Sequence, residues 1–231
     1  MPTLRVNDIT MYYERHGEGV PLVLIAGLGL DLSEWGRIVP WLAERFEVIA
    51  FDNRGAGRTD KPDMPYSMEL MAQDTAGLMQ ALGVERAHIV GVSMGGKIAL
   101  ALALAHPAMV NKLVLVSTSA SRRRHRWRVR LLSLLRNLPI FRGTYPQPRY
   151  AYRRQLQASG AYDGRARLPE LQMPTLILHG KKDQTTPYRL AEEMHAGIAG
   201  SELLAFAGGH IFFFLREQQR FLEAVAAFLE R

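Results

Sequence analysis

A serine lies between two glycines at a point where the sequence changes from a strand pattern to a helix pattern. The short apolar run His88–Val92 leads into Gly91-Val92-Ser93-Met94-Gly95, and a helical pattern begins at once. Such a tight reversal leaves no room for side chains at the flanking positions, and it strains the central residue so that its hydroxyl stands above the sheet edge. The helix N-terminus beneath it favours negative charge. The pattern predicts that Ser93 is a nucleophile; the alternative is an ordinary glycine-rich turn with a serine cap.

A nucleophilic serine needs a base to accept its proton, and the chain has seven histidines. For this kind of turn the expected chain order is serine, acid, histidine. His210 fits, because it follows the strand-like run Ser201–Phe206 and a Gly-Gly pair, where loops gather at the carboxyl edge of a parallel sheet. His179 ends another strand-like run, and we expect it to support the turn at Gly180. The others begin a strand, end a helix or fall at surface positions: His16, His88, His106, His125 and His195.

The acid follows by elimination. Between Glu85 and Asp163 the chain has no Asp or Glu, so no carboxylate can come from the end of the strand Leu113–Val116. Asp183 follows the next strand and precedes His210 by 27 residues. Its role would be to hold the tautomer of the imidazole and to offset its charge once protonated. The alternative is an aspartate that caps a turn.

Acyl transfer also requires donors for an oxyanion. One expected donor is the backbone N–H of Met94, the residue after the serine. The second should come from the loop Ala26–Asp31, with the backbone N–H of Leu28 as the candidate.

Elements that alternate between strands and helices must position these residues. Short apolar runs at 22–26, 48–51, 88–92, 113–116, 175–178 and 201–206 predict strands, most of them parallel and covered on both faces. Helical patterns fall at 34–45, 68–82, 94–105, 188–196 and 211–231. Asn7-Asp8 predicts a hairpin turn at the start. The interval from Val116 to Thr175 has no clear strand and predicts an insert. We expect a core over 1–120 and 171–231, and a helical cap over 121–170.

The excess of basic over acidic residues lies in this insert. Residues 121–167 hold 13 Arg and a single acid, Asp163, whereas the whole chain has a net charge of +7. Residues 122–138 include an amphipathic helical pattern with Trp127 and Leu131 on its apolar side. This pattern is typical either of a helix that covers a core or of one that contacts an anionic membrane. Few aromatics are interleaved with the arginines and no nucleic-acid motif is present, which argues against nucleic-acid binding.

Length and composition exclude other classes. The 231 residues are 48% hydrophobic and 22% charged, a balance typical of a globular domain. No apolar run approaches the ~20 residues that span a bilayer. The start of the chain has no apolar signal segment, so we expect a cytoplasmic protein. The absence of cysteine excludes disulfides and thiolate chemistry, and no cofactor or metal is implied.

Together these motifs resemble the α/β-hydrolase superfamily, in particular its esterases and enol-lactonases. Phe51–Thr59 also resembles the Asp-x-Arg-Gly-x-Gly-x-Ser loop of that family, in which Asp52 and Arg54 would be structural. The resemblance implies a mostly parallel central sheet with helices on both faces and a short helical cap. Two departures are Ala26, where the family usually has histidine before glycine, and a shorter cap. A serine at position 93, rather than the aspartate of dehalogenases and epoxide hydrolases, favours acyl chemistry.

The resulting hypothesis is a serine carboxylesterase with Ser93, Asp183 and His210 as its triad and a small ester or lactone as its substrate. Leu30, Trp127 and Leu131 would line an apolar acyl pocket. One alternative is a lactonase or carbon–carbon bond hydrolase that acts on anionic products of aromatic degradation, because arginine pairs with carboxylates. Another is a ligand- or membrane-binding module without catalysis. The sequence leaves the oligomeric state open.

Overall fold

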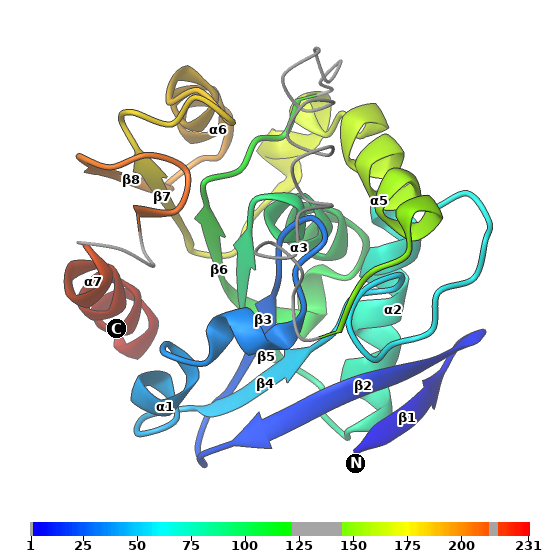
Figure 1. Ribbon diagram of the computed structural model, residues 1–231. Coiled ribbons are helices and arrows are strands. Elements are labelled where there is room, and N and C mark those ends of the chain that lie inside the picture. The colour runs from blue at the N-terminus through cyan, green and yellow to red at the C-terminus, as the bar shows by residue number, and fades with distance from the viewer. Residues whose placement is uncertain (1, 122–144, 213–216) are drawn as a thin grey trace.

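The computed structural model describes residues 2–121, 145–212 and 217–231. In these residues a single sheet has the strand order β1-β2-β4-β3-β5-β6-β7-β8 (Figure 1). β1 and β2 are antiparallel to their neighbours and the other strands are parallel. The strands are β1 Thr3–Val6, β2 Ile9–His16, β3 Pro21–Ile25, β4 Glu47–Phe51, β5 Ala87–Val92, β6 Val110–Val116, β7 Thr175–Gly180 and β8 Glu202–Phe206.

The described helices follow the strands. They are α1 Val39–Leu42, α2 Met68–Ala81, α3 Met94–Ala105, α5 Arg149–Ala161, α6 Arg189–Gly197 and α7 Gln218–Glu230. Short 3-10 helices span Leu32–Trp35, Pro107–Met109 and Arg165–Glu170. No helix in the described ranges is both long and apolar enough to cross a membrane.

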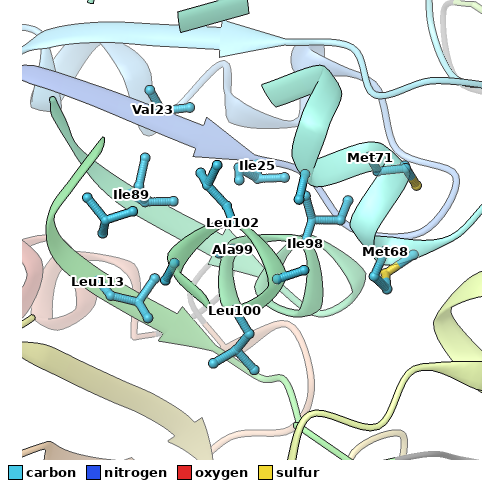
Figure 2. Packing of buried hydrophobic residues seen from close by; sticks show 14 of the residues in the cluster. Val23, Ile25, Met68, Met71, Ile89, Ile98, Ala99, Leu100, Leu102 and Leu113 are labelled. Atoms are coloured by element: carbon cyan, nitrogen blue, oxygen red, sulfur yellow. The ribbon is translucent and has the colours of Figure 1, made fainter. Parts of the chain in front are cut away.

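The parallel strands are apolar on both faces because helices cover both faces. Along β3, Leu22 and Leu24 belong to one buried cluster and Val23 and Ile25 to the other. This alternation follows from the two-residue period of a strand. Residues of α1 and α7 complete the first cluster, and residues of α2, α3 and α6 complete the second. Figure 2 shows side chains of the second cluster, which pack between the strands, α3 and α2.

The predicted hairpin turn at Asn7-Asp8 is confirmed. Val6 pairs with Ile9, and Asn7 has a φ of 52°, in the left-handed region that asparagine tolerates better than most residues. The alternating strand and helix pattern is confirmed as well, and α3 has the predicted bounds.

Two predicted helices are wrong in extent. Instead of one helix over 34–45, the chain forms a 3-10 helix over Leu32–Trp35 and a short α1. Pro40 is the reason, because proline lacks the N–H that would bond back to Gly36 and is tolerated only in the first turn of a new helix.

The last helix begins at Gln218 rather than at 211. The backbone N–H of Phe212 instead closes a turn onto the carbonyl of Gly209, at 3.3 Å. The Phe212 ring stacks on Phe206 with centroids 4.2 Å apart. This aromatic packing holds Phe212 beside β8. The expected helix around Trp127 and Leu131 lies outside the described residues.

Candidate active site

Ser93 has a strained backbone at the junction of β5 and α3. Its φ is 55° and its ψ is −113°, a conformation that costs a residue with a side chain roughly 1–3 kcal/mol. Three hydrogen bonds hold it there. Its N–H donates to the carbonyl of Val116 at 2.9 Å, and its own carbonyl accepts from the Gly96 N–H at 3.1 Å and from the Thr118 hydroxyl at 2.6 Å. Hydrogen bonds to β6 and to the segment after it therefore help to maintain the strained backbone of Ser93.

The glycines on either side of Ser93 are sterically required. A Cβ at Gly91 would lie 2.5 Å from the carbonyl oxygen of Gly95. A Cβ at Gly95 would overlap the carbonyl oxygen of Ile25 and lie 2.7 Å from that of Ala26. Because these obstacles are backbone atoms, they cannot move aside as a flexible side chain could. The glycines thus allow the end of β3 and the start of α3 to meet beneath the serine.

His210 bridges Ser93 and Asp183. Its Nε2 is 3.0 Å from Ser93 Oγ, and its Nδ1 is 2.7 Å from Asp183 Oδ2. Asp183 comes three residues after β7, and His210 lies in the turn after β8. The side chain of Asp183 is fully buried, whereas 20% of the His210 side chain is exposed. The three residues predicted from chain order therefore lie together at one edge of the sheet.

The surroundings of Asp183 favour its ionised form. Burial raises the pKa of this carboxyl, but hydrogen bonds from His179, His210 and the Thr186 backbone outweigh burial and lower the pKa well below its ordinary value. Oδ1 accepts from the N–H groups of Thr185 and Thr186 at 2.8 and 2.7 Å. An ionised carboxylate only accepts hydrogen bonds, so the Nδ1 of His210 carries the proton. Its Nε2 is then free to accept the proton of Ser93.

His179 lies beneath the acid and supports its turn. Its Nε2 is 2.7 Å from the Thr186 carbonyl oxygen and 3.4 Å from Asp183 Oδ2. A carbonyl is an acceptor, so this nitrogen is the donor. The imidazole thereby ties the end of β7 to the segment that places Asp183.

The loop expected to supply an oxyanion donor lies against the serine. Residues 27–30 form a turn closed by the Leu30 N–H and the Gly27 carbonyl at 3.3 Å, and Gly29 has a φ of 69°. A Cβ built on Gly27 would be 3.5 Å from Ser93 Cβ. Leu28 and Leu30 are half-buried in this loop. Met94 is the first residue of α3, and the first N–H groups of a helix have no partner within it.

The loop after β4 is structural, as the resemblance implied. The buried Arg54 forms an ion pair with Asp74 at 2.7 Å and contacts Asp8 at 3.0 Å. Asp52 accepts from the backbone N–H groups of Leu32 and Arg58, each at 2.7 Å. These bonds join the β4 loop to the segment that follows β3.

Two residues that contact the site framework escaped the sequence analysis. Thr118 bonds to Ser93, and Gln155 of α5 bonds to the loop containing Leu28. A polar run directly after an apolar strand, Ser117-Thr118-Ser119, was the available signal for Thr118. Gln155 carries no such signal, since its partner Gly29 lies 126 residues away. Trp127 and Leu131, predicted to line the pocket, lie outside the described residues.

The described residues contain no group of three or more His, Cys, Asp or Glu side chains arranged to hold a metal ion. The site consists of a hydroxyl, an imidazole and a carboxylate in hydrogen-bonded series. Such a series can activate an alcohol oxygen as a nucleophile.

Comparison with known proteins agrees with this geometry. Residues 20–159 match the family described as alpha/beta hydrolase fold, and residues 152–231 match the family described as TAP-like protein. The chain belongs to the alpha/beta hydrolase family and has its fold.

Among curated proteins it is similar to a putative carbamate hydrolase, RutD, from Azorhizobium caulinodans. The two are 32% identical, and the match covers 92% of each chain. Among solved structures it is similar to the enol-lactonase from Burkholderia xenovorans LB400, with a TM-score of 0.89, 27% identity and full coverage of both chains. It is also similar to an esterase from Exiguobacterium antarcticum, with a TM-score of 0.88, 28% identity and 99% coverage of both chains.

Proposed function

We propose that this protein is a serine hydrolase that cleaves small carboxylic esters through an acyl-enzyme intermediate. The observation that carries the proposal is the position of His210, 3.0 Å from the Ser93 hydroxyl on one side and 2.7 Å from the Asp183 carboxylate on the other. Both distances are within the range of hydrogen bonds between a nucleophile, a base and the group that orients the base.

In this mechanism Ser93 Oγ attacks the ester carbonyl while His210 Nε2 takes its proton. Asp183 offsets the charge of the resulting imidazolium. The negative charge on the carbonyl oxygen is held by the N–H groups of Met94 and Leu28. His210 then protonates the leaving alcohol. A water molecule then attacks the acyl-enzyme while His210 accepts one of its protons. The bond between Ser93 Oγ and the acyl carbon breaks, His210 returns the proton to Oγ, and the acid leaves.

Hydrolysis of p-nitrophenyl acetate and butyrate tests the proposal. We expect turnover by the wild type, a fall of kcat by about 10⁶-fold in Ser93→Ala, and a fall of about 10⁴-fold in Asp183→Asn. Ser67→Ala is the matched control, because Ser67 caps α2 through the Leu70 N–H and takes no part in the reaction. Undiminished turnover in Ser93→Ala would refute the proposed nucleophile.

A fluorophosphonate probe distinguishes catalysis from the alternative of a binding module without activity. We expect covalent labelling of the wild type and of Ser67→Ala, and none of Ser93→Ala. A wild type that is folded but resists labelling would favour the binding module.

A lactonase is the second candidate, supported by the similarity to the enol-lactonase along the whole chain. Ring opening of a lactone uses the same attack and the same proton transfers. A panel of lactones, esters, carbamates and vinylogous diketones, with and without carboxylates, tests this candidate and the carbon–carbon hydrolase alternative. Equal rates for acidic and neutral substrates would contradict the alternative in which the substrates are anionic products of aromatic degradation.

Contact of residues 122–138 with an anionic membrane stays a prediction, since these residues lie outside the described ranges. Co-sedimentation with phosphatidylglycerol vesicles and with phosphatidylcholine vesicles tests it. Equal sedimentation with both would contradict it.

A further inference from the structure

The loop proposed to hold the oxyanion has little side-chain support of its own. Of its residues, Ala26-Gly27-Leu28-Gly29-Leu30 have no polar side chain, and the Asp31 carboxylate accepts from the Ser33 N–H instead. Two glycines in five residues also give the unfolded and partly folded loop high conformational freedom. An oxyanion donor is effective only when it is held in place before the reaction. The surrounding structure must therefore supply the contacts that fix this loop.

The ends of the loop are held by residues that follow β4. The side chain of Asn53 donates to the Ala26 carbonyl at 3.1 Å, and Asp52 accepts from the Leu32 N–H at 2.7 Å. The middle of the loop is held from a different part of the chain. The Gly29 N–H donates to Oε1 of Gln155, at 3.0 Å, and Gln155 lies on α5.

Gln155 is fitted to this position by its amide group. Its side chain is buried, and its Nε2 donates to the Arg54 carbonyl at 2.8 Å. Its Oε1 also accepts from Nε2 of Gln147 at 2.9 Å, and the same Gln147 nitrogen donates to the Gly55 carbonyl at 2.7 Å. The partners determine which way the amide faces, because an N–H must meet an oxygen and a carbonyl must meet a donor. A side chain of the same size without both groups would leave buried backbone groups unsatisfied.

The bond to Gly29 fixes the peptide group next to the expected donor. The Gly29 N–H belongs to the peptide group that links Leu28 to Gly29. Since peptide groups are planar, only the φ and ψ angles of Leu28 separate this group from the Leu28 N–H. Gly29 itself has a φ of 69°. This left-handed conformation of the turn requires a particular orientation of the peptide group between Leu28 and Gly29.

We propose that Gln155 is a positioning residue that holds the oxyanion loop from helix α5, so that the Leu28 N–H is aimed at the reacting carbonyl. This inference rests on the proposed ester hydrolysis and assigns Gln155 no contact with substrate. It makes α5 part of the catalytic framework, because the helix carries the group that fixes the loop.

The test compares Gln155→Met with Gln157→Met. Gln157 lies two residues further along α5 and is exposed, so its substitution changes the same helix without touching the loop. In Gln155→Met we expect kcat for p-nitrophenyl butyrate to fall about tenfold or more, short of the ~10²–10³-fold seen when a donor is lost outright. KM should stay within about threefold, because the loop acts on the transition state more than on bound substrate. Gln157→Met should match the wild type.

A trifluoromethyl ketone supplies a measurement that a purely structural role would not affect. Its adduct with Ser93 carries the oxyanion, so its Ki should rise in Gln155→Met by the same factor by which kcat/KM falls. The conservative variant Gln155→Glu keeps the acceptor for the Gly29 N–H and should retain more activity than Gln155→Met. If Gln155→Met does not fold, Gln155→Glu is compared with the wild type in its place.

The outcomes separate this inference from the proposed function. If the wild type neither hydrolyses esters nor reacts with a fluorophosphonate, the proposed function fails. If the wild type is active and folded Gln155→Met keeps its kcat and its Ki within about twofold, the positioning role is refuted and the esterase proposal is not. Equal loss of kcat in Gln155→Glu and Gln155→Met would also contradict the role assigned to the Gly29 bond.

Discussion

The hydroxyl of Thr118 donates a hydrogen bond of 2.6 Å to the carbonyl oxygen of Ser93. Ser93 is strained, with a φ of 55°, and Thr118 belongs to the segment after β6 rather than to the turn itself. The strain of the nucleophile is therefore maintained in part by the segment that follows β6. The same threonine lies against Gly96, where a Cβ would be 2.6 Å from Thr118 Cβ.

Substitution of Thr118 by valine should lower both stability and activity. Valine keeps the shape but loses the donor, so we expect the free energy of unfolding to fall by about 1 kcal/mol and kcat to fall several-fold. Thr75→Val is the control, because Thr75 is also buried and donates to a backbone carbonyl, that of Met71, within α2. Urea unfolding and esterase assays measure the two effects. A loss of kcat in Thr75→Val as large as in Thr118→Val would contradict a specific effect on Ser93.

The pH dependence of stability should reflect the ionised state of Asp183. Its pKa is lowered in the folded protein, so the stability it contributes is fully present above the unfolded carboxyl pKa of about 3.9. That contribution is lost as the pH falls through the lower pKa of the folded state. The difference in free energy of unfolding between wild type and Asp183→Asn should therefore shrink between pH 5 and pH 2.5. Urea titrations across this range measure it, and a constant difference would contradict the prediction.

The ion pair between Arg54 and Asp74 should be important for stability. Both side chains are buried, and removal of the guanidinium in Arg54→Met leaves a buried carboxylate without its partner. We expect a loss of about 3–5 kcal/mol in the free energy of unfolding. Arg167→Met is the control, because the Arg167–Glu170 pair is about half exposed and should contribute at most about 1 kcal/mol. Similar losses in the two variants would refute the distinction between buried and exposed pairs here.

Aromatic packing beneath the His210 turn should affect activity through the position of the imidazole. Phe212, which lies two residues after His210, stacks on Phe206. Phe212→Leu should lower stability by about 1–2 kcal/mol and should also lower kcat, because the turn is less firmly held. Phe46→Leu is the control, since Phe46 is buried in the same cluster but packs edge-on against His88. We expect a similar loss of stability there with an unchanged kcat, and an unchanged kcat in both variants would refute the effect.

Local sequence was sufficient for the elements around the nucleophile. The change from strand to helix periodicity at Ser93 and the glycines at 91 and 95 predicted the turn and the bounds of α3, because each signal depends on neighbours within a few residues. The boundaries at 34–45 and 211–231 were wrong. At 34–45 the reason is Pro40, which a helix tolerates only in its first turn. Pro40 is visible in the sequence, whereas the apolar pattern of 211–231 does not mark the later start of the last helix at Gln218.

The sequence by itself determined the fold class and the order of serine, acid and histidine, because strands, helices and tight turns are encoded in short-range periodicity and residue type. Only the tertiary structure decided how near these groups come to one another and which side chains hold them. The contacts of Gln155 with Gly29 and of Thr118 with Ser93 join residues that are 126 and 25 positions apart. Such contacts depend on the order of strands in the sheet and on how helices pack across its edge, and no local pattern carries that information.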